Sequence, residues 1–459
     1  MKSQSQEPSP NRRRFIRSLV GGSMLFPAVL SELSAWGSDP RLNPLRAKPS
    51  PFRGKATSVI FLYMSGGVSH MESFDPKPKL AADHGKPSGV KHLLAPHWGF
   101  QPGGKCGTPV SDLFPEIRTC MDDICLIRSM RTDHLSHMEA TLGIHTGSVS
   151  VKRPSIGSWV SFGLGTVNQN LPSFVVIAPK QPYGGDQCWS ADFLPAHHEG
   201  TRIVPGPNPI ENLSPQSSLT IQEKELSLLE RFNRRHLNSL GIDSTLAARM
   251  QSFETAFGMQ REMPEVLDIS RETKATLELY ALEPGKTDGF GWQCLIARRM
   301  VERGVRFIEL IDSGSDAPNN WDSHTNILRD HPPRARNVDK PIAGLLRDLK
   351  QRGMLDETLV VWTTEFGRTP HDDGPKGRSH HPDAFSSWMA GAGVRGGMVY
   401  GKTDEYGYKV VNQEVHIHDF HATILHLLGF DHERLTYRHA GRDFRLTDVH
   451  GRVVHEILS

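Results

Sequence analysis

The fold is decided by the stretch TSVIFLYMSGG, residues 57–67. Residues 57–64 are almost all apolar, β-branched or aromatic, without alternation between apolar and polar positions. Such a run predicts a strand that is buried on both faces, which is typical of a parallel sheet. The sequence Ser65-Gly66-Gly67 then predicts a tight turn at the carboxyl end of this strand.

Similar apolar runs recur along the chain, and helical patterns lie between them. The further runs are residues 124–127, 173–177, 305–311 and 359–362, and the helical patterns are residues 292–303 and 337–352. The second pattern is expected to end at Gly353, and a later helix is expected to start from a cap on Asp419 and to end at Gly429. Strands that alternate with helices predict an α/β fold with a mainly parallel sheet.

Residues 210–282 differ from this alternation because they show little strand signal. Helical patterns occur at residues 221–240 and 244–260. We therefore expect a helical insertion on the α/β core. The length of 459 residues allows either one large domain with insertions or two domains.

The N-terminal segment predicts an export signal. Residues 11–17 read NRRRFIR, residues 18–33 are moderately apolar, and residues 34–38 are mostly small. This order is typical of a twin-arginine signal peptide, here residues 1–37, and a Pro-rich linker follows at residues 38–56. We therefore expect the twin-arginine translocase as a partner and a periplasmic or otherwise extracytoplasmic location. The alternative is a disordered basic tail, and the broken apolar segment does not predict a membrane span.

Charge and cysteine content exclude several functional classes. The formal net charge is only +2 and the basic residues are dispersed, so we expect no nucleic-acid groove and no polybasic membrane patch. The five cysteines are scattered and have no CxxC spacing, which predicts neither a zinc knuckle nor a full disulfide framework. One or two disulfides are compatible with an exported protein.

Polar side chains that suit a metal ion follow two of the predicted strands, where binding groups gather in open α/β sheets. Asp322 and His324 follow one strand, and in an extended backbone their side chains share a face. Glu365 and His380 follow the next strand. These side chains are suitable ligands for zinc or manganese, and an open coordination position would activate water. The alternative is hydrogen-bonded loop polarity, because the chain has 23 histidines.

Two further groups have two interpretations each. The first group is Asp133, His134, His137 and His145. These residues follow another predicted strand and approach the same pocket, or His137 and His145 form hydrogen bonds in the core. The second is Ser65, which ends the first strand, where a nucleophile or an oxyanion donor would be useful. The alternative for Ser65 is a hydroxyl that satisfies the glycine turn.

Six motifs are specific in combination and occur in order between residue 57 and the end of the chain. They are MSGGVSHMESFDPKP at 64–78, RPSIGSWV at 153–160, WDSH at 321–324, TEFGRTP at 364–370, GRSHHP at 377–382 and HDFHATIL at 418–425. Together they closely resemble a family of exported bacterial proteins of unknown function. This family is often labelled sulfatase-like and is related to the alkaline phosphatase and sulfatase superfamily. The resemblance implies an alkaline-phosphatase-like domain over residues 57–459, with a three-layer α/β/α core and metal ligands at the carboxyl edge of its sheet.

The resemblance also implies roles for single residues. Asp322 and His324 look like the Asp and His of one metal site, and His380 resembles its late histidine. Glu365 occupies the place where the superfamily has the aspartate of an Asp-His pair. The helix at Asp419 resembles the superfamily's closing helix, which implies a structural role.

The sequence also departs from the superfamily pattern. No carboxylate stands at the Ser65 end of the first strand, and Phe366 stands where the paired histidine belongs, so half of a second metal site is missing. Ser379 replaces the aspartate of the family's usual Gly-Arg-Asp-His. Neither Cys-x-Pro-x-Arg nor Ser-x-Pro-x-Arg occurs, so the standard formylglycine mechanism of sulfatases is not expected.

Two functions are consistent with these residues. One is a metal-dependent hydrolase of phosphate or sulfate esters, in which Arg368 or Arg378 holds the anion through two hydrogen bonds. Its expected substrate is a small anionic ester or a sulfated or phosphorylated glycan. The other is a non-catalytic exported binding or scaffold protein that kept the core and a remodelled pocket.

Overall fold

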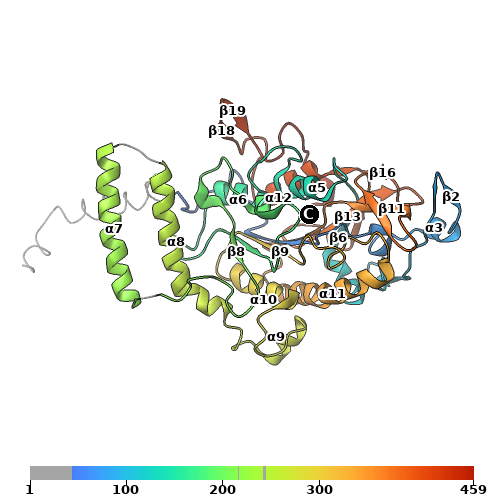
Figure 1. The fold of residues 1–459 in the computed structure, drawn as a ribbon, viewed down its shortest axis with the longest axis horizontal. Coiled ribbons are helices and arrows are strands. Elements are labelled where there is room, and N and C mark those ends of the chain that lie inside the picture. Colours follow the sequence, from blue (N-terminus) through green and yellow to red (C-terminus); the bar gives the residue numbers. More distant parts are fainter. Residues whose placement is uncertain (1–43, 216, 241–243) are drawn as a thin grey trace, which may run out of the picture.

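The computed structural model describes residues 44–215, 217–240 and 244–459 (Figure 1). The predicted signal segment at residues 1–37 lies outside the described residues, together with the first part of the linker. Within the described ranges, no helix is both long and apolar enough to cross a membrane.

A nine-stranded sheet forms the centre of the molecule. Its strands are β1 (Ser58–Tyr63), β6 (Ile124–Arg131), β7 (Phe174–Ile177), β8 (Thr201–Ile203), β9 (Phe307–Ile311), β10 (Thr358–Thr363), β13 (Phe385–Ala390), β14 (Met398–Tyr400) and β17 (Val415–His416). Neighbours follow the order β14-β6-β13-β10-β1-β9-β7-β8, and β17 also pairs with β6. β1 pairs in parallel with β10 and β9, and among these strands β13 alone runs antiparallel to its neighbours. The five predicted strands and the mainly parallel sheet are confirmed.

Helices cover both faces of the sheet. Along β1, Ile60 and Leu62 face one hydrophobic core, and Val59, Phe61 and Tyr63 face the other, because successive side chains of a strand point to opposite faces. The helices that close the first core are α10 (Gly289–Val301) and α11 (Ile327–Gln351), and those that close the second are α5 (His137–Thr146), α6 (Ile156–Leu164) and α12 (Ile417–Leu427) (Figure 1). The three-layer α/β/α core is therefore confirmed.

Smaller elements surround this core. The two-stranded sheets are β2 (Pro87–Ser88) with β3 (Lys91–His92), β4 (Phe100–Gly103) with β5 (Thr108–Ser111), β11 (Gly367–Asp372) with β12 (Arg378–His381), β15 (Lys402–Thr403) with β16 (Val410–Asn412), and β18 (Tyr437–His439) with β19 (Arg442–Phe444). The short α-helices are α3 (Pro78–Ala82) and α4 (Pro115–Arg118), and the 3-10 helices are His70–Glu72, Met121–Asp123, Gly185–Trp189, Ala196–His198 and His455–Ile457. The β11–β12 hairpin follows β10 and carries the loop that the sequence marks as a candidate site.

The expected helical insertion is present. Its helices are α7 (Leu219–Leu240), α8 (Ser244–Leu267) and α9 (Lys274–Leu279). α7 and α8 lie side by side and project from one end of the molecule (Figure 1). The insertion therefore lies away from the edge of the sheet where the candidate site forms.

Two helix starts differ from the prediction. α11 begins at Ile327, well before residue 337, because the Asn326 side chain caps it and accepts a hydrogen bond from the backbone N–H of Arg329 at 3.2 Å. Prolines inside α11 hide this earlier start in the sequence. The cap of α12 is His416 and not Asp419, whose side chain instead accepts the backbone N–H of His416 at 3.1 Å in a capping box.

All five cysteines lie within the described residues, and none is in a disulfide. Four of them are buried, and Cys106 is exposed. The disulfides that the sequence allowed are therefore absent from this part of the chain, and the two hydrophobic cores hold the fold together.

Candidate metal centre

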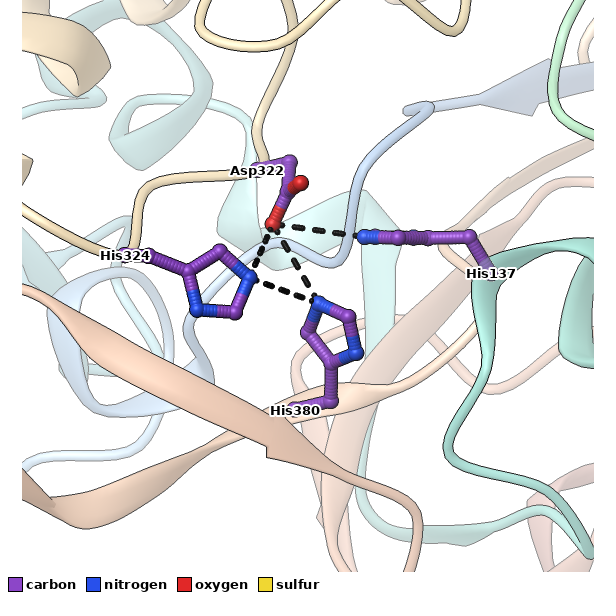
Figure 2. A group of neighbouring side chains, drawn as sticks. All are labelled: His137, Asp322, His324 and His380. Carbon is purple, nitrogen blue, oxygen red and sulfur yellow. Dashed lines mark hydrogen bonds and ion pairs between the residues drawn. The ribbon is translucent and has the colours of Figure 1, made fainter. Parts of the chain in front are cut away.

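Four polar side chains converge at the carboxyl edge of the sheet (Figure 2). Asp322 and His324 lie in the loop after β9, and His380 lies in the hairpin after β10. His137 is the first residue of α5, which follows β6. These three strands point the same way, so their carboxyl ends meet at one edge. Each of the four residues offers one ligand atom, and these atoms all lie within 4.8 Å of one another.

The carboxylate of Asp322 lies at the centre of this group. Its Oδ1 is 2.9 Å from His324 Nε2, 3.2 Å from His137 Nε2 and 3.3 Å from His380 Nε2. The Nε2 atoms of His324 and His380 are 2.9 Å apart. Three imidazole nitrogens and one carboxylate oxygen therefore surround a single point, which is a donor set that suits zinc or manganese.

Carboxylates fix the tautomer of two of these imidazoles. His137 donates its Nδ1–H to Glu365 Oε1 at 2.7 Å, and His324 donates its Nδ1–H to Asp373 Oδ2 at 2.7 Å. A neutral ring that donates from Nδ1 carries a lone pair on Nε2. Nε2 of His137 is buried, and it faces Asp322 Oδ1 at 3.2 Å. A lone pair and a carboxylate oxygen at this distance repel each other unless a proton or a cation lies between them, so this position suits a cation.

His380 completes the inward-facing set. Its Nδ1–H donates to the carbonyl oxygen of Leu135 at 2.8 Å, so its lone pair also faces the common point. Two imidazole lone pairs at 2.9 Å, as on His380 and His324, repel each other unless a proton or a metal ion lies between them. The arrangement consequently fits a cation.

The pKa shifts of the four residues differ in direction. Burial opposes ionisation of Asp322, yet the three imidazoles that face it and the charge of Arg368 hold the pKa of that carboxyl well below its ordinary value. Burial lowers the pKa of His380, which favours the neutral ring that a metal requires. Contact with Asp322 raises the pKa of His324, and at His137 burial lowers the pKa less than the contacts with Asp322 and Glu365 raise it. Binding of an ion would therefore release protons from these two rings. The His324 side chain is 37% exposed against 11% for Asp322, so solvent reaches the group from the His324 side.

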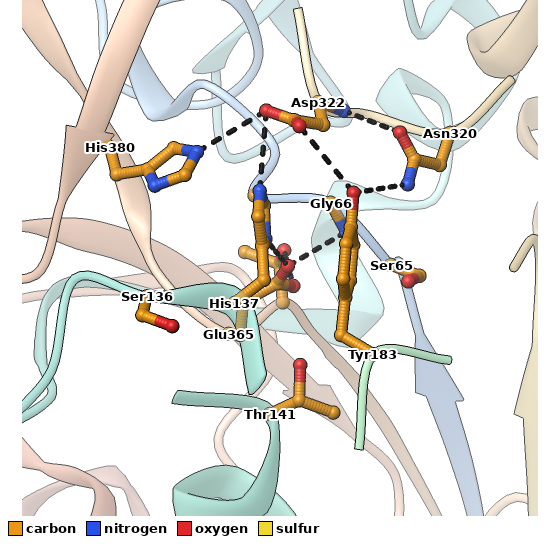
Figure 3. A network of polar contacts seen from close by, with 12 residues as sticks. Ser65, Gly66, Ser136, His137, Thr141, Tyr183, Asn320, Asp322, Glu365 and His380 are labelled. Carbon is orange, nitrogen blue, oxygen red and sulfur yellow. Dashed lines mark hydrogen bonds and ion pairs between the residues drawn. The ribbon is translucent and has the colours of Figure 1, made fainter. Parts of the chain in front are cut away.

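Glu365 lies beside the four ligands and is not one of them (Figure 3). Its side chain is fully buried, and its Oε1 accepts hydrogen bonds from His137 and from the backbone N–H of Gly66 at 2.8 Å. Its Oε2 accepts from the Tyr63 hydroxyl at 2.9 Å and from the Thr364 hydroxyl at 3.0 Å. With both oxygens engaged, Glu365 contacts the site through His137, in contrast to the direct ligand that the sequence predicts.

Arg368 and Arg378, which the sequence predicts as anion holders, are fully buried and engaged inside the protein. Arg368 donates to Asp322 Oδ1 at 2.7 Å and to the carbonyl oxygen of Gly67 at 2.9 Å. Arg378 donates to Glu72 Oε1 at 2.8 Å, and both of these side chains are 0% exposed. The two guanidinium groups hold loops together and are not free to bind a substrate.

Ser65 lies apart from the four ligands (Figure 3). Its hydroxyl donates to the carbonyl oxygen of Gly314 at 3.3 Å, and its backbone N–H donates to Asp312 Oδ1 at 3.0 Å. Neither contact provides a base that would activate the hydroxyl. The geometry therefore agrees with the turn interpretation of Ser65 and not with a nucleophile.

The group of residues after β6 divides between the site and the core. His137 reaches the metal centre, whereas His145 is fully buried in the core and its Nε2 lies 2.6 Å from Glu309 Oε1. Asp133 and His134 are not among the four converging residues. Each of the two sequence interpretations is therefore correct for one histidine of this group.

Two side chains beside the site were not predicted. The Tyr183 ring stacks on His137, with centroids 4.1 Å apart and an interplanar angle of 8°. Its hydroxyl accepts a hydrogen bond from Asn320 Nδ2 at 2.9 Å and lies 3.4 Å from Asp322 Oδ2 (Figure 3). The second is Asp373, which orients His324. Asp373 lies in the polar loop after β10, close in sequence to His380. This position was the one feature of the sequence that could have indicated its role.

Comparisons with known proteins give a family and a set of distant structures. Residues 56–458 match the family described as "Protein of unknown function (DUF1501)". No curated protein is a significant match to the chain.

Solved structures with a similar fold include three enzymes. Lipoteichoic acid synthase LtaP from Listeria monocytogenes is 7% identical, with 88% of this chain and 79% of that chain covered and a TM-score of 0.37. PsFucS1 sulfatase from Pseudoalteromonas sp. is 13% identical, with 83% and 69% covered and a TM-score of 0.35. Alkaline phosphatase from the Antarctic bacterium TAB5 is 9% identical, with 82% and 99% covered and a TM-score of 0.32. The TM-scores are low, so function is inferred from the residues of this chain alone.

Proposed function

This chain belongs to the DUF1501 family of proteins of unknown function, and we propose that it is an exported metal-dependent hydrolase of phosphate or sulfate esters. One divalent ion, zinc or manganese, would be held by His137, Asp322, His324 and His380. The observation that carries the proposal is the convergence of three Nε2 atoms on Asp322 Oδ1 while a separate acceptor holds each Nδ1–H. Export by the twin-arginine translocase to the periplasm, predicted from residues 1–37, is part of the same proposal.

The chain's own residues would keep the ligands in place. Arg368 fixes Asp322 through the 2.7 Å contact to Oδ1, and Glu365 fixes the ring of His137. A divalent ion in such a site makes a bound water more acidic and polarises an ester oxygen. Because Ser65 is turned to a carbonyl group, we propose direct attack by water and no covalent intermediate.

The proposed substrate is a small anionic ester or a sulfated or phosphorylated glycan. Arg368 and Arg378 are engaged with internal acceptors, so these two arginines would not clamp its anionic group. The charge of the substrate would instead be met mainly at the metal centre, next to the partly exposed His324.

A second function is favoured by one observation. Four protein ligands would fill all four positions of a zinc ion, as in structural zinc sites, whereas catalytic zinc sites commonly keep three protein ligands and an open position. A non-catalytic exported binding or scaffold protein would use the ion to hold its loops together.

A substrate screen on the metal-loaded full chain separates the two functions. The panel contains a phosphomonoester, a phosphodiester and a sulfate ester. The hydrolase proposal expects turnover of at least one substrate, loss of turnover with a chelator and recovery when the ion returns. Stoichiometric metal without turnover of any of the three would favour the non-catalytic function.

Ser65→Ala is expected to leave any hydrolase activity unchanged. The hydroxyl of Ser65 contacts the carbonyl oxygen of Gly314 and not the ligands, so its loss should cost about 1 kcal/mol of unfolding free energy. Steady-state kinetics and urea unfolding measure the two effects separately. A loss of kcat with intact metal content would instead make Ser65 a nucleophile.

Glu365→Gln is expected to weaken metal binding by about 10- to 100-fold. The carboxylate holds the Nδ1–H of His137, and an amide in its place can offer a donor where an acceptor is needed. Competition with a chromophoric chelator measures the affinity, and circular dichroism checks the fold. Glu278→Gln, on an exposed side chain of α9, is the matched control. Equal affinity in the folded Glu365 variant and the wild type would contradict the orienting role.

A further inference from the structure

A cavity lies at the edge of the sheet opposite the metal centre. Its volume is about 790 Å³. The loops before β1, β9 and β10 line it, with Thr57, Arg306 and Glu357 as the residues next to these strands. These strands are parallel, so their first residues share the amino edge, and the six-residue β1 separates the two edges by roughly 20 Å. The cavity is therefore distinct from the metal centre.

Basic side chains dominate the charge of this cavity. Its charged lining residues are Lys48, Arg53, Lys55, Arg306, Asp356 and Glu357. Four cations thus face two carboxylates. Across the described parts of the chain, none of the four cations lies within 4.0 Å of a carboxylate oxygen. Four cations minus two carboxylates leave the lining with a formal net charge of +2.

Lys48 and Arg306 are half-buried and reach only neutral acceptors. Lys48 Nζ donates to the carbonyl oxygen of Phe162 at 2.7 Å and lies 5.1 Å from the centre of its ring. Arg306 Nη1 donates to the carbonyl oxygen of Thr57 at 3.0 Å, and its Nε is buried without a partner. Burial lowers the pKa of both side chains, so an anion would relieve the cost of keeping them charged.

Backbone hydrogen bonds fix the walls of the cavity. The N–H of Lys48 donates to the carbonyl oxygen of Leu164 at 2.8 Å. The N–H of Ala56 donates to Leu427 at 2.9 Å, and the N–H of Thr57 donates to Glu357 at 2.8 Å. The loop that carries three of the four cations is thus tied to α6, to α12 and to the start of β10. A ligand would meet a largely formed site.

We propose that this cavity binds a tetrahedral oxyanion, the sulfate or phosphate group of a ligand, through Lys48 and Arg306. A guanidinium presents a planar fork of donors and an ammonium presents a compact charge, and both suit an anion with several acceptor oxygens. Among the described residues Arg306 is hydrogen-bonded through Nη1 alone, which leaves Nη2 to donate to the anion. Arg53 and Lys55 add exposed positive charge around the entrance. The proposal is independent of the metal centre and of any catalytic activity.

Isothermal titration of the full chain with sodium sulfate and with sodium phosphate, against sodium chloride at equal ionic strength, tests this site. Saturable binding of at least one oxyanion is expected in the wild type. Arg306→Gln and Lys48→Gln should each weaken it about tenfold or more. Lys274→Gln, on a side chain of α9 that is 89% exposed, should leave it unchanged.

Two further measurements sharpen the result. Glu357→Gln removes a competing carboxylate from the lining and should tighten binding, which a purely structural role of this residue would not produce. Dextran sulfate is then compared with sodium sulfate at the same concentration of sulfate groups. If dextran sulfate competes more strongly, the ligand is a sulfated polymer. If the two compete equally, the ligand is the free ion. The absence of saturable binding up to about 10 mM oxyanion, or unchanged affinity in folded Arg306 and Lys48 variants, would overturn the proposal.

Discussion

Replacing His324 with alanine is expected to reduce the affinity for zinc by roughly a hundredfold or more, which corresponds to about 2.7 kcal/mol of binding free energy. His324 contributes Nε2 at 2.9 Å from Asp322 Oδ1, and its ring is held by Asp373. The variant loses one of four ligands. Because the side chain is 37% exposed, its truncation is expected to leave no large cavity in the core, and the variant should stay folded. Competition with a chromophoric chelator measures the change.

His92→Ala provides the matched control for this prediction. His92 is also a histidine beside the carboxylate of an aspartate in the same region, but its side chain is 60% exposed and it is not among the converging residues. The control is expected to retain the affinity of the wild type. If His324→Ala binds zinc as tightly as His92→Ala, the four-residue metal centre is not the site.

Replacing Glu72 with glutamine is expected to destabilise the fold by about 3–5 kcal/mol. The carboxylate accepts from Arg378 Nε at 3.1 Å and from Nη2 at 2.8 Å, and both side chains are 0% exposed. Removing its charge leaves the guanidinium of Arg378 buried without a counter-charge, which costs more than the loss of an exposed ion pair. Urea unfolding followed by circular dichroism measures the difference.

The stability of Glu72→Gln distinguishes two roles of Arg378, an internal ion pair with Glu72 and binding of a substrate anion. An arginine that served the substrate would tolerate Glu72→Gln with a change of only about 0.5 kcal/mol in stability and would instead show altered anion affinity. Glu278→Gln, on an exposed carboxylate, gives the baseline for removing a surface charge. A small loss of stability in Glu72→Gln, close to this baseline, would restore the anion-binding interpretation.

The sequence predicted the sheet well because its strands are nearly continuous apolar runs. β1 and β10 were visible as such runs, and both are completely buried. The start of α11 was missed because its prolines resemble the first turn of a helix, while the true cap is Asn326. The cap of α12 was placed on Asp419 because aspartate is a preferred cap, whereas His416 takes that place and Asp419 supports it from within the first turn.

The candidate site could be predicted only in part. Asp322 and His324 stood out because two residues in an extended loop share a face, and the structure brings both to one point with His380. His137 lies on another element, and no spacing along the chain indicates which of its neighbours faces the site. The partner of Glu365 was invisible for the same reason, since the sequence separation of the pair is 228 residues.

The arginines were misjudged for a related reason. A polar loop that contains Arg368 and Arg378 resembles an anion-binding loop, because the sequence does not show which polar groups become buried. The partner of Arg378 is 306 residues away, and that of Arg368 is on the loop after another strand. Long-range contacts of this kind decide whether a guanidinium is a binding group or an internal support.

The most direct test of the central claim is the metal content of the folded full chain, measured by elemental analysis as purified and after incubation with zinc and with manganese. The four converging residues predict close to one tightly bound ion per chain, and a content that falls sharply in His324→Ala while the circular dichroism spectrum is kept. A folded wild-type protein that binds neither ion after incubation would contradict the metal centre and the hydrolase that depends on it.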